Sequence, residues 1–457
     1  MLQIYNSKSL QKEIFEPITP GHIGLYICGI TVYDHCHIGH ARVFLAFDVI
    51  VRYLQYRGYQ VRYIRNITDI DDKIIHRAEE LGESIQDLTY RFIASMNEDL
   101  AALHVLTPTE EPRATLYMKE MVHMIENLIK KNYAYVGPNN DVYFRVRKFD
   151  TYGALSHKNI EDLASGSRVE INEAKEDPLD FVLWKQAKDH EPAWGAPWGK
   201  GRPGWHIECS AMSAACLGET FDIHGGGPDL KFPHHENERA QSEAVHGKRM
   251  VNYWMHAGFL QVNKQKMSKS LGNFFTIKDF LSQFDPEVLR YMIISSHYRS
   301  PIEYSDEHLT SAKLALDRFY IALKDIEKAE RPLESGFEAR FQQAMDDDFN
   351  TPEALAVLFD LVREINRNRE LNMKLAAELA ALLIYLGGVL GLLQRNPQEF
   401  LQGHGDIDEA KVAELIAARN RARSEKQWPE ADRLRQKLTD MGVVLEDSNN
   451  GTVWRRI

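Results

Sequence analysis

The sequence predicts an α/β fold: a parallel sheet interrupted by an inserted subdomain, then an α-helical bundle and a small C-terminal domain. Three observations carry this prediction. Strand, helix and strand patterns follow one another between Gly24 and Ile67. Helical patterns dominate after Ser305, and basic residues outnumber acidic ones from Lys411 onward. A chain of 457 residues is long enough for several domains.

The first alternating unit begins with a short apolar run from Gly24 to Ile30, which predicts a buried strand. Apolar residues then recur at helical spacing from Arg42 to Arg57, and Gly58 is typical of a helix end. Tyr59 to Ile67 returns to a strand pattern. Because a strand–helix–strand crossover favours parallel neighbours with ligands at their carboxyl ends, we expect a Rossmann-like sheet.

The rest of the chain divides by composition and periodicity. Pro, Gly and Trp are concentrated in Pro192 to Trp205, which indicates the return linker of an insertion, and Thr220 to His224 then resumes the main sheet. Helices are predicted at 307–329, 337–345, 352–368 and 371–393, with a terminal hairpin around Asn449–Asn450–Gly451. We therefore expect five segments: the first half of the sheet domain at 1–111, an inserted connective subdomain at 112–204, the second half of the sheet domain at 205–305, the bundle at 306–400, and a small basic domain at 401–457.

Charge and cysteine content narrow the class of protein. The net charge of −11 argues against a protein that only coats nucleic acid. Residues 411–457, however, carry ten Lys or Arg against seven Asp or Glu, which permits a local contact with nucleic acid. Four widely spaced cysteines do not suggest disulfides, so we expect a reducing, cytoplasmic location. No signal peptide is recognised, and the longest apolar run, Leu379 to Leu393, is too short to span a membrane.

Two separated motifs predict the handling of ATP. His37, Gly39 and His40 form an H-x-G-H motif between the predicted strand and helix. Backbone amides and the helix dipole attract phosphate there, the imidazoles can donate to it, and the glycine lets the nucleotide approach. Lys266 and Lys269, in Lys-Met-Ser-Lys-Ser, can place ammonium groups on the triphosphate. Either motif alone fits a solvated loop, but together they predict attack on the α-phosphate of ATP, with Mg²⁺ accompanying the leaving pyrophosphate.

Four residues far apart in the sequence could hold a metal ion. Cys28 lies near the end of the first predicted strand, and Cys209 lies far downstream. His234 and Glu238 are four residues apart on a predicted helix, so both project from one face. Two thiolates, one imidazole and one carboxylate suit tetrahedral Zn²⁺.

Spacing alone leaves other roles open for these residues. The two cysteines can be small buried apolar residues, the histidine a helix-end residue, and the acid a solvated one. His224 and His235 are competing ligands. We expect Cys36 and Cys216 not to bind the metal.

Taken together, these motifs are typical of one family. The chain resembles the cysteinyl-tRNA synthetases, which are class I aminoacyl-tRNA synthetases, nearly from end to end. The resemblance rests on Thr31–Val32–Tyr33–Asp34 with the His-Ile-Gly-His motif, on Gly201 to Ser210, on Phe232 to Glu238, and on Lys-Met-Ser-Lys-Ser. No motif position departs from the family pattern. The resemblance implies that one Zn²⁺ per chain also binds the substrate's thiolate. It further implies that four residues hold this Zn²⁺: Cys28, Cys209, His234 and Glu238.

The resemblance also implies further binding residues. Three are expected to enclose L-cysteine: Thr68, Trp205 and His224. Five residues of the tail are expected to contact the anticodon of tRNA(Cys): Arg423, Trp428, Asp432, Arg435 and Trp454. The tail tryptophans have a structural alternative, because both could pin a small helical domain.

The activity implied is formation of cysteinyl-adenylate from L-cysteine and ATP, followed by transfer of cysteine to the terminal ribose of tRNA(Cys), and we expect a monomer. Zinc would select the substrate because it lowers a thiol's pKa and binds soft sulfur. One alternative replaces tRNA with an amino sugar, and the bundle and basic tail argue against it. Another is a non-catalytic, zinc-stabilised RNA-binding protein, and the intact nucleotide motifs argue against that.

Overall fold

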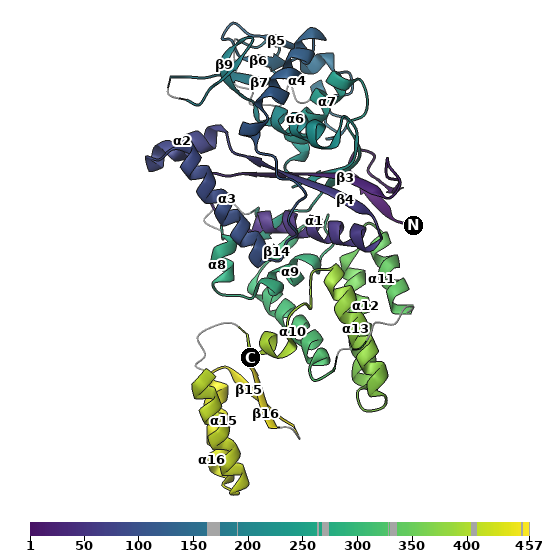
Figure 1. The fold of residues 1–457 in the computed structure, drawn as a ribbon, viewed down its shortest axis with the longest axis vertical. Coiled ribbons are helices and arrows are strands. Elements are labelled where there is room, and N and C mark those ends of the chain that lie inside the picture. Colours follow the sequence, from purple (N-terminus) through teal and green to yellow (C-terminus); the bar gives the residue numbers. More distant parts are fainter. Residues whose placement is uncertain are drawn as a thin grey trace. The chain divides into compact units, whose positions relative to one another are not determined.

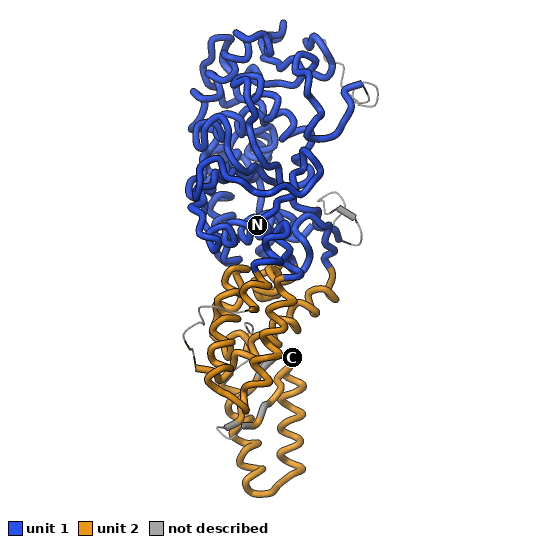
Figure 2. Tube along the Cα trace, turned by 90° about the vertical axis from the view of Figure 1, so that its right-hand side faces the viewer, with its two compact units in different colours: residues 1–278, 293–304, 342–353 blue, residues 279–292, 305–341, 354–457 orange. Residues whose placement is uncertain are grey.

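The computed structural model describes residues 1–161, 174–189, 191–262, 265–266, 274–327, 329, 336–403, 409–448 and 451–456. These residues form two compact units (Figure 2). The first contains Met1–Lys278, Ile293–Tyr304 and Gln342–Glu353, and the second contains Asp279–Met292, Ser305–Phe341 and Ala354–Ile457. Within the described ranges, no helix combines the length and the apolar character that a bilayer span requires.

A four-stranded parallel sheet with the order β11-β10-β3-β4 forms the centre of the first unit, which confirms the predicted α/β core. Its strands are β3 (His22–Thr31), β4 (Gln60–Thr68), β10 (Phe221–Gly226) and β11 (Val251–His256). From β3 the chain crosses to β4 on one side, whereas β10 lies on the other side of β3. The carboxyl ends of β3 and β10 therefore flank the point where the strand order reverses, and α/β proteins bind ligands at such points. Helix α1 (Ile38–Tyr56) runs along one face of β3 and β4, and α6 (Trp205–Leu217) lies beyond the other (Figure 1).

Helix α1 begins at Ile38, earlier than the predicted Arg42, because His37 caps its first turn. Arg42 is then buried inside the unit. Its guanidinium donates to four backbone oxygens at 2.8–3.0 Å, those of Ile293, His297, Tyr298 and Ser300. These bonds fix the start of α1 to the turn that leads into β14 (Ile302–Tyr304).

A small second sheet carries the first residue of the lysine motif. Strand β12 (Leu260–Val262) pairs in parallel with β14 and antiparallel with β13 (Gln265–Lys266). Because Arg42 holds the turn before β14, the start of α1 and this small sheet are tied together. The sheet therefore positions Lys266 relative to the start of α1.

The predicted insertion contains an antiparallel sheet with the order β5-β6-β7-β9-β8. Its strands are β5 (Ala134–Val136), β6 (Val142–Phe144), β7 (Phe181–Gln186), β8 (Trp194–Ala196) and β9 (Gly199–Pro203). Phe144 and Trp184 of this sheet share one buried apolar cluster with Tyr26 and Ile64 of the central sheet. The five segment boundaries drawn from the sequence stay predictions.

The remaining elements of the first unit surround these sheets. They are β1 (Gln3–Asn6), β2 (Gln11–Ile14), α2 (Asp72–Leu81), α3 (Ile85–Ala102), α4 (Met118–Lys130), α7 (Glu236–His246), the 3₁₀ turns Ala114–Leu116 and Val146–Lys148, and the π-helical turn Lys231–His235. Helix α8 (Ile277–Leu281) begins in the first unit and ends in the second. The helix predicted to carry both His234 and Glu238 begins only at Glu236, and His234 lies in the turn before it.

Helices dominate the chain after β14, as predicted. They are α10 (Asp306–Leu323), α11 (Gly336–Asp346), α12 (Thr351–Asn368), α13 (Met373–Val389) and α14 (Pro397–Gln402), and one further helix, α9 (Pro286–Ile294), precedes β14. Helix α10 ends before the predicted residue 329 because Lys324 is extended and Asp325 has a positive φ of 60°. In the second unit, the buried carboxylate of Glu287 accepts from the Tyr320 hydroxyl at 2.7 Å and from the Leu393 N–H at 2.6 Å, which fastens three segments together.

Two helices and a hairpin form the C-terminal end. They are α15 (Glu409–Ser424), α16 (Trp428–Asp440), β15 (Val443–Ser448) and β16 (Gly451–Arg456). The antiparallel pairing of β15 and β16 confirms the predicted hairpin, whose Asn449 and Asn450 lie outside the described residues. Leu434 and Leu438 of α16 and Val412 of α15 pack with Val443 in one small apolar core.

Asp99 on α3 is a buried carboxylate whose charge opposes folding. Burial, with a smaller contribution from Glu98, raises its pKa to about 6. Since the folded pKa exceeds the unfolded value, the stability linked to its proton is present below about pH 4 and is lost as the pH rises through about 6. We expect Asp99→Asn to raise the free energy of unfolding by up to about 3 kcal/mol at pH 8 and by little at pH 4. Thermal unfolding at both pH values checks this, and an equal shift at both would contradict it.

Candidate active site

The H-x-G-H motif forms the first turn of α1 as a reciprocal cap. His37 is the N-cap residue, with an extended backbone (φ −111°, ψ 164°). The His40 N–H donates to His37 Nδ1 at 3.2 Å, and the His37 N–H donates to His40 Nδ1 at 3.3 Å. Because each Nδ1 accepts, each neutral ring carries its proton on Nε2. The motif therefore offers two N–H donors at a helix amino end, where phosphate is favoured.

The lysine motif is described only at its first residue. Lys266 is the last residue of β13 and has a described backbone, whereas Lys269 lies outside the described residues. Beyond the motif, the Phe275 carbonyl accepts from the Ile38 N–H at 3.2 Å, and the Ile277 N–H donates to the Cys36 carbonyl at 2.9 Å. The chain therefore returns from the lysine motif directly beside the H-x-G-H turn. The roles of both lysines and of Gly39 stay predictions.

The four predicted metal ligands lie together, and all are buried. Cys28 Sγ is 3.7 Å from Cys209 Sγ and 3.4 Å from Glu238 Oε1. His234 Nε2 is 3.0 Å from the same carboxylate oxygen. Zinc bonds of about 2.3 Å to sulfur and about 2.0 Å to nitrogen or oxygen give tetrahedral edges of about 3.8 Å between two sulfurs and about 3.3 Å between nitrogen and oxygen. The donor types and their separations therefore fit Zn²⁺.

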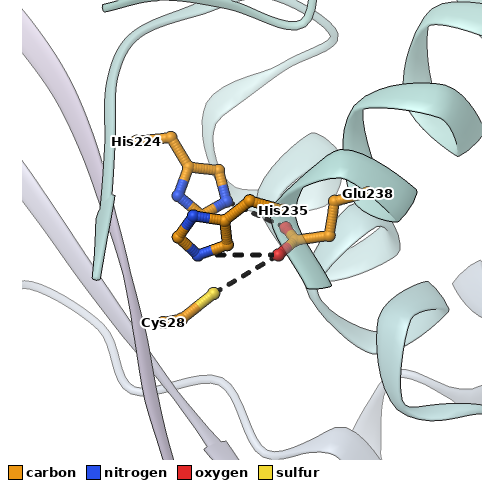
Figure 3. A group of neighbouring side chains, drawn as sticks. All are labelled: Cys28, His224, His235 and Glu238. Carbon is orange, nitrogen blue, oxygen red and sulfur yellow. Dashed lines mark hydrogen bonds and ion pairs between the residues drawn. The ribbon is translucent and has the colours of Figure 1, made fainter. Parts of the chain in front are cut away.

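A second group of possible ligands shares Cys28 and Glu238 and adds His224 and His235 (Figure 3). His224 Nε2, from β10, is 2.8 Å from Glu238 Oε2, whereas His235 Nε2 is 4.0 Å from Glu238 Oε1. The first group offers two sulfurs, and its measured separations lie nearer the tetrahedral edges. His224 can then orient Glu238 by a hydrogen bond from outside, as partners of metal ligands commonly do. The geometry favours the first group, and its assignment stays a prediction.

His206 is a partner of His234 that is not predicted from the sequence. Its Nδ1 is 2.8 Å from His234 Nδ1, which leaves His234 Nε2 directed at Glu238. Since an N–H···N bond fixes the ring, His206 sets which nitrogen of His234 can bind a metal. A signal for it exists in the sequence, because His206 lies three residues before Cys209 on one face of α6.

His256, at the end of β11, is a second unassigned partner. Its Nε2 is 2.9 Å from His235 Nδ1, and its Nδ1 is 2.8 Å from the Ser7 hydroxyl. All three residues are buried. No spacing in the sequence points to this contact, because it joins segments that only the sheet brings together.

Burial and charge set the protonation of the cluster. Burial raises the pKa of the Cys28 thiol, and the adjacent Cys209 and Glu238 raise it further. Burial alone would lower the pKa of His234, but Glu238 and Cys209 raise that pKa to about 10. The cluster therefore holds protons that a bound cation would displace.

The three predicted amino-acid-binding residues surround this cluster. Thr68, at the carboxyl end of β4, donates its hydroxyl to buried Glu208 Oε2 at 2.9 Å. Trp205 is 39% exposed, and its ring centroid lies 4.1 Å from that of His234. His224 is fully buried against Glu238. The structure thus places Trp205 and His224 against the metal group and Thr68 against the residue before Cys209, and their contact with an amino acid stays a prediction.

The five predicted tRNA-binding residues lie on the C-terminal elements. Trp428 is 56% exposed at the start of α16, which also exposes Asp432 and Arg435. Arg423 donates to Asp447 Oδ2 at 2.5 Å, so part of its charge is used within the domain. Trp454 packs on the small apolar core. Of the two tryptophans, Trp454 thus has a role in packing the domain, whereas Trp428 is largely exposed. All five contacts with tRNA stay predictions.

Comparison with known proteins decides the family. The model described as tRNA synthetases class I (C) catalytic domain matches residues 14–314, the DALR domain matches 340–394, and the cysteinyl-tRNA ligase anticodon binding domain matches 408–455. The cysteine–tRNA ligase of Azotobacter vinelandii is 60% identical over 458 residues, covering 100% of this chain and 99% of that protein. The chain belongs to the cysteine–tRNA ligase family. Another member, from Thioalkalivibrio sulfidiphilus, is 59% identical and covers 100% of both chains.

Solved structures agree on the fold of this family member. Mycobacterium tuberculosis methionyl-tRNA synthetase in complex with methionyl-adenylate has a TM-score of 0.58 at 14% identity, covering 86% of this chain and 94% of that one. A putative arginyl-tRNA synthetase from Campylobacter jejuni has a TM-score of 0.55 at 13% identity, covering 84% and 95%. At these identities the similarity concerns the fold alone, and it agrees with the predicted fold class.

Proposed function

We propose that this member of the cysteine–tRNA ligase family joins L-cysteine to ATP as cysteinyl-adenylate, releasing pyrophosphate, and then transfers cysteine to the 3′-terminal ribose of tRNA(Cys). The observation that carries the proposal is full-length similarity to cysteine–tRNA ligases. The site supports it, because Cys28 of the metal group and His37 of the phosphate turn lie on and directly after β3.

His37 and His40 would stabilise the charge that develops on the transferring phosphate. The reciprocal cap orients their Nε2–H groups before the charge forms, which reduces the reorganisation that the reaction needs. Lys266 and Lys269 would neutralise the triphosphate together with Mg²⁺, and Gly39 would admit the nucleotide. The carboxylate of the amino acid is already a nucleophile, so positioning and electrostatics suffice for the first step.

Cys28, Cys209, His234 and Glu238 would hold one Zn²⁺ per chain. When bound, zinc supplies a soft Lewis acid that prefers a thiolate to a hydroxyl, which separates cysteine from serine. Thr68, Trp205 and His224 would enclose the amino acid beside this group. A pocket that uses size alone discriminates far less well between such similar side chains.

The C-terminal domain would read the anticodon of tRNA(Cys) through Arg423, Trp428, Asp432, Arg435 and Trp454. The match to an anticodon binding domain over 408–455 supports tRNA as the acceptor rather than an amino sugar. An exposed tryptophan suits stacking on an unpaired base.

We also propose a monomer that works in a reducing cytoplasm. All four cysteines are free thiols in the structure, and a reducing compartment would keep them available to a metal.

Two assays test the proposed function. In the first, ATP–pyrophosphate exchange is measured with cysteine, with serine and with no amino acid, and we expect exchange with cysteine only. In the second, charging of tRNA(Cys) is measured, and we expect cysteinyl-tRNA. Exchange without charging would favour a small-molecule acceptor, whereas no exchange at all would favour a non-catalytic protein.

A further inference from the structure

The segment that follows the lysine motif is joined by backbone bonds to the H-x-G-H turn. The Phe275 carbonyl and the Ile277 N–H bond to residues on either side of His37, at 3.2 and 2.9 Å, and His37 and Thr276 form an isolated antiparallel bridge. Two hydrogen bonds in register fix both the distance and the direction of one strand against the other. The position of Phe274 relative to His37 is therefore set by the backbone.

The ring of Phe274 uses this position to contact the His37 imidazole. Their centroids are 5.2 Å apart at an interplanar angle of 78°, which is the edge-to-face geometry that aromatic pairs favour. On another side, His37 stacks on His40 with centroids 3.5 Å apart and an angle of 16°. The His37 ring is thus restrained by one neighbouring ring from its own helix and by another from the returning segment.

This second restraint matters because the cap alone is weak. The two bonds that orient the imidazoles are 3.2 and 3.3 Å long, at and just beyond the upper end of the usual range for N–H donors. Rotation of the His37 ring would break its cap bond and turn its Nε2–H away. A phenyl edge packed on the imidazole opposes that rotation without using either ring nitrogen.

We infer that Phe274 is a positioning residue for adenylation, which keeps the His37 imidazole oriented so that its Nε2–H meets the transferring phosphate. This inference rests on the proposed function. Phe274 itself needs no contact with the substrate, since it acts through His37. It also links the two ATP motifs, because the residue that orients the first lies four positions after the end of the second.

Phe274→Leu in the full-length, zinc-containing protein tests the inference, with Phe275→Leu as the matched control. Phe275 is the neighbouring aromatic residue, is 40% exposed, and directs its ring at Tyr304 with centroids 5.6 Å apart. Leucine at 275 retains the carbonyl that pairs with Ile38. We expect Phe274→Leu to lower kcat for ATP–pyrophosphate exchange about tenfold with nearly unchanged KM for ATP and cysteine. Phe275→Leu should stay within about twofold of the wild type, and Phe274→Tyr should restore most of the activity.

A double-mutant cycle separates this role from a general structural one. His37→Asn retains a cap acceptor but lacks the Nε2 donor, so we expect Phe274→Leu to cost nothing further in that background. Equal losses in both leucine variants, or a further tenfold loss in the His37→Asn background, would overturn the inference.

One readout needs no substrate. In protein carrying ¹³C-labelled histidine rings, Phe274→Leu should broaden or shift the His37 signal while Phe275→Leu leaves it in place. An unchanged His37 signal in Phe274→Leu would overturn the inference even if the enzyme is active. Absence of cysteine-dependent exchange in the wild type would instead refute the proposed function.

Discussion

Cys28→Ser is expected to lower the metal content of the purified protein and to raise the KM for cysteine more than about 100-fold, with a much smaller change in the KM for ATP. Cys28 Sγ lies within 3.4–3.7 Å of two other candidate donors, so its replacement removes a sulfur that is adjacent to both of them. The H-x-G-H turn is held by its own cap bonds and by the segment around Phe274, and it does not depend on this thiol. Elemental analysis and pyrophosphate exchange at varied cysteine and ATP measure the two effects.

Cys216→Ser is the matched control for this prediction. Cys216 is also a buried free thiol, but its sulfur contacts the Tyr117 hydroxyl at 3.6 Å and it belongs to neither metal group. We expect it to retain metal and cysteine affinity. A Cys28→Ser protein that is shown to be metal-free and still binds cysteine as tightly as the wild type would refute the assigned role of the cluster.

The second large effect is expected for His40→Asn, which should lower kcat for adenylation by about 100- to 1,000-fold, as removal of one preorganised donor does in other enzymes. An asparagine oxygen can replace Nδ1 as the acceptor of the His37 N–H, so the cap and the start of α1 should survive. The Nε2–H is lost. Thermal unfolding and pyrophosphate exchange on the same preparation distinguish the two roles of the ring.

His40→Gln is the complementary variant. Its longer amide can reach toward the place of Nε2 but is poorly placed to accept from the His37 N–H, so we expect partial activity with a lower unfolding temperature. Full exchange activity in His40→Asn would show that the ring serves only as a cap. The assignment of His40 to the transferring phosphate would then be wrong.

The fold was largely predictable because its main signals are local. The apolar run at Gly24 to Ile30 and the spacing from Arg42 to Arg57 correspond to β3 and α1, and their connection requires parallel strands. The sequence pattern does not predict the start of α1 at Ile38, because a histidine pair caps this helix, whereas Ser, Thr, Asp and Asn are the usual N-caps. The order of the short strands in the insertion was not readable, since strands of three residues carry almost no periodicity.

The metal group shows what spacing cannot decide. Its ligands come from β3, α6 and the segment around the start of α7, and 181 residues separate Cys28 from Cys209. From the sequence, His224 and His235 are competing ligands that spacing does not exclude. Only the fold gives the distances by which the two groups of candidate ligands can be compared. Only the fold shows that His206 contacts His234 and that His256 contacts His235. The family resemblance supplied the tetrad that physical reasoning about the residues left open.

Zinc K-edge X-ray absorption on the zinc-loaded protein, recorded alone, with L-cysteine and with L-serine, tests whether the metal selects the substrate. We expect one additional sulfur neighbour of the metal when cysteine is present and none when serine is present. An unchanged metal environment at saturating cysteine, with exchange activity intact, would contradict it.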